Sequence, residues 1–261
     1  MRIPFVVTAL ALVAVVAVPA ATAQDFNWKG RIASGKRLEV KGVNGDVRAV
    51  AATGGEAVVT AAKRAHRSDP DEVEIRVVEH EDGVTICAVY PTPPRARREN
   101  NCEPGDRWHS STEDNDVTVH FEVQVPAGVE FTGRTVNGEM SVEDLKADVR
   151  ASTVNGSVRV TTTGLAEAST VNGSVYVEMG RANWTDELDF TTVNGRITLL
   201  LPDKLDTEVR ASTVNGEIES DYPLTISGRF GPRRLRGTIG NGGRTLNLST
   251  VNGEIRLKKS T

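Results

Sequence analysis

The tripeptide Val-Asn-Gly recurs along the chain and constrains the fold more than any other sequence feature. It occurs seven times, and every copy except the first follows a threonine. From the second copy onward, successive asparagines are 18, 17, 22, 21 and 37 residues apart, so the last gap spans about two units. A degenerate copy, TIGNG at residues 238–242, lies inside that gap. Recurrence at a nearly fixed period is typical of a repeat protein.

Apolar and polar residues alternate on both sides of each Val-Asn-Gly. Before the tripeptide, equivalent positions hold Val149, Ala166 and Leu188, and polar residues such as Arg150 and Glu167 follow them. Strict alternation predicts short β-strands with one buried face. Asparagine and glycine both tolerate positive φ, so we expect each unit to form two strands around one sharp corner.

Two all-β architectures fit this pattern. Asn-Gly between alternating strands is also a strong hairpin signal, so an antiparallel β-meander of Asn-Gly hairpins is one alternative. We favour a parallel β-helix, or β-solenoid, with coils of 17–22 residues, because four residue types recur together at that spacing. In stacked coils, identical residues lie about 4.8 Å apart and asparagine amides can hydrogen-bond along the stack. The predicted corner ladder comprises Asn44, Asn137, Asn155, Asn172, Asn194, Asn215 and Asn252, with Gly138, Gly156, Gly173, Gly195, Gly216 and Gly253.

The first half of the chain repeats less regularly. We expect irregular coils over residues 24–116, including a surface loop over residues 91–116 that is rich in proline, arginine and acidic residues. Cys87 and Cys102 are the only cysteines, and in an oxidising compartment we expect a disulfide between them. Closing a loop of about 15 residues stabilises a fold by roughly 3 kcal/mol. Regular repeats follow over 117–261, and the absence of a linker composition predicts a single domain over 24–261.

Residues 1–23 have the features of a secretory signal peptide. Arg2 precedes an apolar run from Ile3 to Val18, and small residues lead up to Ala23. No later segment approaches the roughly 20 apolar residues that span a bilayer. We therefore predict an exported protein, periplasmic or extracellular, with no integral membrane span. The net charge of −4, with both signs interspersed, argues against nucleic-acid binding.

Metal-binding residues are sparse. The four histidines all precede the second Val-Asn-Gly copy and lack the spacing of metal-binding motifs. The best candidate cluster is His109 with Asp114 and Asp116, although a solvated loop explains these residues more simply. We predict no metal and no cofactor.

Charged residues offer two further kinds of site. Glu167 and Asp189, on adjacent units, are the candidates for acid–base chemistry on a carbohydrate, but arginines share their column and we favour surface charge alternation. Two groups of arginines could bind anionic glycans or phospholipid headgroups. One group is Arg95, Arg97 and Arg98 in the loop, and the other is Arg229, Arg233, Arg234 and Arg236 near the C-terminus.

Three parts of the chain resemble a family of exported bacterial proteins called putative adhesins. They are TICAVYP at residues 85–91, VPAGV at residues 125–129, and the Thr-Val-Asn-Gly series. The resemblance implies a right-handed β-helix and a location in the envelope or outside the cell. It implies adhesion through the family name alone.

The sequence therefore favours a non-catalytic secreted or envelope scaffold, an adhesin-like protein that binds a protein, glycan or envelope polymer along its β surface. Two alternatives belong to other classes. One is a carbohydrate-active β-helix enzyme, and the other is an envelope-stress module that binds anionic lipid or peptides.

Overall fold

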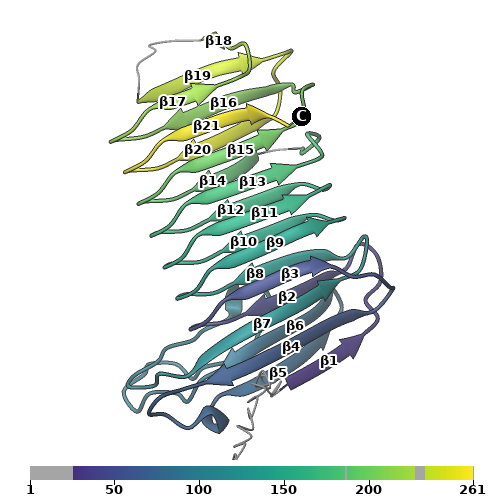
Figure 1. Cartoon of the computed structure of the whole chain (residues 1–261), viewed down its shortest axis with the longest axis vertical. Helices are drawn as coiled ribbons and strands as arrows, with labels where there is room; N and C mark the ends of the chain where they lie inside the picture. The colour runs from purple at the N-terminus through teal and green to yellow at the C-terminus, as the bar shows by residue number, and fades with distance from the viewer. Residues whose placement is uncertain (1–25, 186, 227–232, 261) are drawn as a thin grey trace, which may run out of the picture.

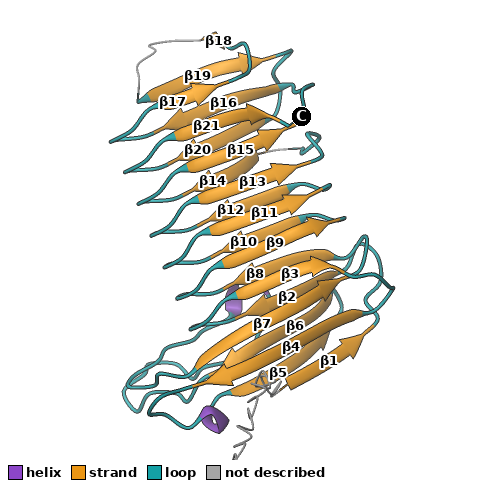
Figure 2. Ribbon diagram, in the orientation of Figure 1, coloured by secondary structure: helices purple, strands orange, loops and turns teal. Residues whose placement is uncertain are grey.

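The computed structural model describes residues 26–185, 187–226 and 233–260. Within them the secondary structure consists of strands in two large sheets and two short 3₁₀ helices, Pro70–Glu72 and Gly105–Arg107 (Figure 2). The all-β prediction is confirmed. The predicted signal peptide, residues 1–23, lies outside the described residues.

The strands form a ten-stranded sheet and an eleven-stranded sheet (Figure 1). In spatial order, the ten-stranded sheet contains β1 (Phe26–Gly30), β4 (Ala57–Arg64), β7 (Thr118–Val125), β3 (Val47–Ala51), β9 (Met140–Leu145), β11 (Val158–Thr162), β13 (Val175–Met179), β15 (Ile197–Leu201), β21 (Ile255–Lys259) and β17 (Ile218–Ser220). The eleven-stranded sheet contains β18 (Thr225–Ile226), β19 (Arg234–Ile239), β16 (Thr207–Ser212), β20 (Thr245–Ser249), β14 (Glu187–Thr191), β12 (Ala166–Ser169), β10 (Val149–Ser152), β8 (Glu130–Arg134), β2 (Arg37–Lys41), β6 (Gly83–Val89) and β5 (Glu74–His80).

Each Val-Asn-Gly unit places one strand in each sheet and turns at the tripeptide between them. We name each unit by its asparagine: β10 and β11 flank Asn155, and β12 and β13 flank Asn172. Equivalent strands of neighbouring units pair in parallel, as β10 does with β12 and β11 with β13. The antiparallel meander is therefore wrong for the repeats, because the corner carries the chain to the other sheet instead of folding a strand back on its neighbour.

The spatial order of the units differs from their order in the sequence. The C-terminal unit, β20 and β21, lies between the Asn194 unit and the Asn215 unit. The degenerate copy at residues 238–242 is not a coil corner: it forms the turn after β19, where the backbone N–H of Asn241 donates to Asp206 Oδ1 at 2.8 Å. The 37-residue gap thus holds β19, which pairs antiparallel with β16 at the end of the sheet.

Interactions between units explain three of the four motif residues. Every asparagine amide except that of Asn44 donates to the asparagine side-chain oxygen of an adjacent unit at 2.7–2.8 Å, and these six hydrogen bonds link all seven asparagines. Each inward-facing threonine donates to a glycine carbonyl of the neighbouring unit, as Thr153 does to Gly138 O at 2.9 Å. The valine is not explained in this way. In five units it is 38–54% exposed to solvent.

Glycine is required at the corner chiefly because neighbouring backbones approach closely. A Cβ added to Gly173 would lie 2.0 Å from Gly156 O, and equivalent clashes occur along the row. Tolerance of positive φ, which suggested these residues for the corner, is used at only some of the glycines. Gly45, Gly156 and Gly173 have positive φ, whereas none of the seven asparagines does. Packing between units, more than local turn geometry, therefore dictates this residue.

The core lies between the two sheets and consists of the inward-facing columns. Val149, Ala166 and Leu188 are buried on the eleven-stranded sheet, and Val158 and Val175 face them from the ten-stranded sheet. The two-residue period of the sequence therefore places the core face of each strand correctly.

The N-terminal end departs from the expected irregular coils. β4 pairs antiparallel with both β1 and β7, and β5 pairs antiparallel with β6. Only Glu81 and Asp82 separate β5 from β6, which is too short a connection to reach the other sheet, so the two strands form a hairpin.

Candidate functional site

The outer face of the eleven-stranded sheet carries two hollows that are lined by charged side chains. The disulfide-tied loop after β6 covers the N-terminal part of this face. Cys87 and Cys102 form a disulfide, with their Cα atoms 5.6 Å apart.

This loop is more than the solvated surface loop that we expected. It buries Lys41 on β2, whose Nζ donates to Glu103 O at 2.6 Å and Gly105 O at 2.8 Å. Lys41 also forms an ion pair of 3.1 Å with buried Glu39. Burial lowers the pKa of Lys41, and the nearby Glu39 carboxylate opposes that shift. The sequence alternation could not reveal the pair, because these residues occupy outward positions and become buried only under the loop.

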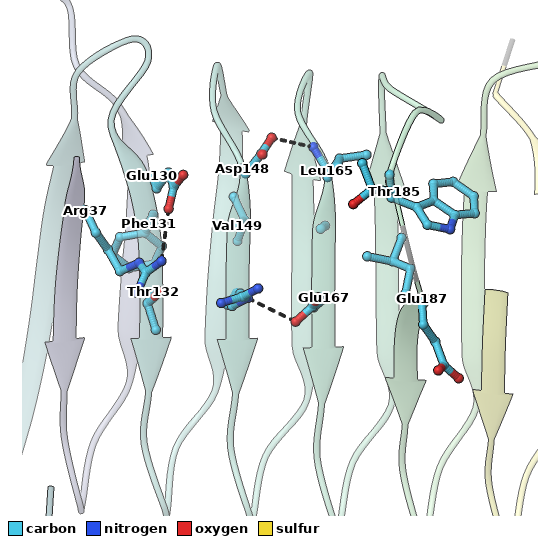
Figure 3. A pocket seen from close by; sticks show the side chains of 14 residues that line it. Arg37, Glu130, Phe131, Thr132, Asp148, Val149, Leu165, Glu167, Thr185 and Glu187 are labelled. Atoms are coloured by element: carbon cyan, nitrogen blue, oxygen red, sulfur yellow. Dashed lines mark hydrogen bonds and ion pairs between the residues drawn. The ribbon is translucent and has the colours of Figure 1, made fainter. Parts of the chain in front are cut away.

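The first hollow lies across β2, β8, β10, β12 and β14 and has a volume of about 310 Å³ (Figure 3). Ion pairs cross it from strand to strand: Arg37 to Glu130 at 3.1 Å and Arg150 to Glu167 at 3.0 Å. The buried residue Trp184 also lines this hollow, and its Nε1 donates to Thr245 O at 3.0 Å. The lining is polar, and four of its charged side chains form these two ion pairs.

The two carboxylates predicted as candidates for acid–base chemistry, Glu167 and Asp189, both interact with neighbouring side chains. Glu167 is held by Arg150, and Asp189 accepts a hydrogen bond from Asn247 Nδ2 at 3.0 Å. Both candidates for carbohydrate hydrolysis therefore have structural partners on a neighbouring strand.

The candidate metal cluster does not assemble. Among the described residues, no group of three or more His, Cys, Asp and Glu side chains lies together. Asp116 instead accepts backbone N–H groups of residues 66–68, at 2.9 Å from Ser68. Hydrogen bonds from Ser68 lower the pKa of Asp116 to about 2. His109 is engaged through its backbone N–H, which donates to Asn101 Oδ1 at 2.8 Å.

The structure separates the two predicted arginine groups. Arg95, Arg97 and Arg98 lie in the loop after β6, near one end of the eleven-stranded sheet, whereas β19 is at the other end. In the C-terminal group, Arg229 lies outside the described residues, Arg234 and Arg236 lie on β19, and Arg233 directly precedes it.

Sequence reasoning missed one more arginine, which lies beside this C-terminal group. Arg210 on β16 lies directly opposite Arg236 of β19. Both line the second hollow, which has a volume of about 550 Å³. Only the antiparallel pairing of β16 with β19 brings these two residues together, and no repeat pattern signals that pairing.

The fold and these surfaces define an all-β repeat protein with extended polar faces. A family model described as Toastrack DUF4097 matches residues 106–258, more than half of the chain. The chain therefore belongs to the Toastrack DUF4097 family. No curated protein matches it significantly. Within the described residues, no helix combines the length and apolar character needed to cross a membrane.

Two solved structures are similar to this chain. One is described as a putative cell adhesion protein from Clostridium sporogenes ATCC 15579: identity is 10%, the TM-score is 0.45, and the match covers 90% of this chain and 99% of that one. The other is described as a putative adhesin from Bacteroides fragilis NCTC 9343, with 11% identity, a TM-score of 0.35, and coverage of 90% and 96%.

Proposed function

We propose that this protein is a non-catalytic binding scaffold, exported to the periplasm or beyond the cell, whose eleven-stranded sheet binds a polymer on its outer face. One observation carries the proposal: outward side chains of the same type stand in register across successive strands. A row of hydroxyl groups runs over five strands and comprises Ser152, Ser169, Thr191, Ser249 and Ser212.

Such a row suits a linear polymer. Parallel strands repeat about every 4.8 Å, so each strand offers a similar hydroxyl to the next stretch of an extended ligand. At the N-terminal end of the row, the neighbouring charges of Arg150 and Glu167 neutralise each other. A hydroxyl-rich face supports binding through many weak polar interactions, which is typical of glycan recognition.

The remaining parts of the proposal concern fold detail and location. Parallel pairing between equivalent strands supports a β-solenoid, and we infer right-handed coils from the family resemblance. The apolar N-terminal sequence and the disulfide support export into an oxidising compartment. The names of the two similar structures agree with an adhesin-like role without adding weight to it.

The test is to incubate the protein with a panel of bacterial and plant polysaccharides and measure both binding and chain cleavage. We expect saturable binding to at least one polymer with no release of reducing or unsaturated ends. Replacing Ser169 by Trp should obstruct the hydroxyl row and weaken binding, whereas Thr198→Trp, on the outer face of the ten-stranded sheet, serves as the matched control. Reproducible release of new chain ends would establish the enzyme alternative instead.

A further inference from the structure

The second hollow, on the outer face formed by β14, β20, β16 and β19, has an unusual charge distribution. Three arginines line it: Arg210 from β16, and Arg234 and Arg236 from β19. The hydroxyls of Ser212 and Ser249 line it as well. This hollow therefore combines several cationic donors with the end of the hydroxyl row.

The antiparallel register sets like charges against each other. Arg236 lies directly opposite Arg210, and Arg234 lies opposite Ser212. Directly opposed side chains in a sheet have Cβ atoms about 5 Å apart, and like charges there are destabilising. Other arginines on this face, such as Arg37 and Arg150, have a carboxylate on the next strand.

No carboxylate neutralises the three arginines within the described residues. None of them lies within ion-pair distance of an acidic side chain there. Asp189, the acidic residue in the lining, accepts its hydrogen bond from Asn247. An arrangement that destabilises the free protein in this way is typical of a site that an anion completes.

We propose that this hollow binds an anionic substituent of an acidic polysaccharide, a sulfate or a carboxylate group, between Arg210 and Arg236. Guanidinium groups present planar pairs of N–H donors that match the oxygens of both groups. The polymer extends from the hollow along the row through Ser249 and Thr191, which continues across the sheet. This inference rests on the proposed function and adds the chemical class of its ligand.

The experiment measures affinity by calorimetry for heparin, polygalacturonate and neutral dextran. The double variant Arg210→Gln/Arg236→Gln should lose at least about tenfold in affinity for the acidic polymers, since it removes two charge-assisted interactions. The control Arg48→Gln/Arg159→Gln removes the same charge from the outer face of the ten-stranded sheet and should change affinity by less than about twofold. Equal losses in both variants, or no loss in the first, would overturn the site.

Two further measurements are needed. One distinguishes a polysaccharide from a lipid as the source of the anion, and the other distinguishes failure of the anion site from failure of the proposed function. Vesicles of phosphatidylglycerol should not bind, and binding to them without binding to acidic polymers would refute the polysaccharide assignment. If sodium sulfate binds the native hollow and not the double variant while no polymer binds, the proposed function fails and the anion site stands. If polymers bind both forms equally, the scaffold stands and the anion site fails.

Thermal unfolding separates a binding role from a structural one. Without ligand, Arg236→Gln should raise Tm by about 1–3 °C, because it relieves the repulsion from Arg210. The same variant should bind the acidic polymer more weakly. A lower Tm together with weaker binding would mean that Arg236 supports the fold, and would contradict the proposal.

Discussion

Replacing single asparagines in the ladder by leucine tests both the stacking interactions and the unexpected order of the units. In the sequence, Asn252 is the last Val-Asn-Gly asparagine, so a stack in chain order would place it at the end. In the structure, Asn252 is internal: it donates to Asn194 Oδ1 at 2.7 Å and accepts from Asn215 at 2.7 Å. Asn215 is the terminal member, with a single ladder bond to Asn252.

The magnitudes follow from the ladder hydrogen bonds that each asparagine side chain makes. A hydrogen bond contributes about 1 kcal/mol net to stability, and solvent-exposed groups lie at the lower end because water can replace the partner. Leucine at position 172 or 252 removes two of these hydrogen bonds and should cost roughly 1–2 kcal/mol, whereas leucine at position 215 removes one and should cost about half as much. Each kcal/mol lowers Tm by about 2–4 °C in a domain of this size.

The assay is urea unfolding and thermal unfolding of the three single variants. Asn241→Leu is the control, because Asn241 follows the degenerate repeat pattern but lies outside the ladder. The leucine variants at positions 172 and 252 should lose the same free energy of unfolding. The variant at position 215 should lose less, and the variant at position 241 should lose least. If Asn252→Leu is much milder than Asn215→Leu, the C-terminal unit does not lie between its two neighbours and the reasoning is refuted.

Three further perturbations test other interactions. Lys41→Met leaves the Glu39 carboxylate buried without its cation and should destabilise by roughly 3 kcal/mol in urea unfolding, and a cost below about 1 kcal/mol would show that the loop does not bury the pair. Gly173→Ala drives a Cβ into the carbonyl of the neighbouring unit and should cost about 1–3 kcal/mol, whereas Gly54→Ala, with open space around it, should be neutral. The pKa of Asp116 is lowered to about 2, below its ordinary value near 4 in an unfolded chain, so its contribution is complete above pH 4 and lost as the pH falls toward 2. In Asp116→Asn, Tm should therefore fall less steeply between pH 4 and pH 2 than in the native protein. Parallel plots of Tm against pH for the two proteins would contradict the lowered pKa of Asp116.

The sequence predicted the features that depend on interactions between identical positions. The alternation around each corner identified the buried columns, and the recurrence of Asn155 and Asn172 pointed to hydrogen bonds between the amides of neighbouring units. It could not predict that the Asn252 unit lies beside the Asn194 unit, because every corner is complementary to every other. The physical role of the glycine was also hidden, since close approach to a neighbouring backbone leaves no local signal.

Long-range antiparallel pairing limited the prediction of the candidate site. Arg234 and Arg236 were recognisable as a basic cluster, but Arg210 belongs to a repeat column whose other members are paired or neutral. Only the return of β19 along β16 gives these three residues a common surface. The burial of Lys41 was equally inaccessible, because it depends on a loop that begins about 50 residues later in the chain.

The most direct test of the proposed binding face compares the accessibility of the two outer sheet faces with and without polymer. Ser249→Cys places a thiol on the eleven-stranded sheet, and Thr198→Cys places one on the ten-stranded sheet, in a protein whose native cysteines form a disulfide. Maleimide labelling should slow at least about tenfold at position 249 in saturating acidic polysaccharide and stay unchanged at position 198. Equal protection of both positions, or protection of position 198 alone, would contradict the assignment of ligand binding to the eleven-stranded sheet.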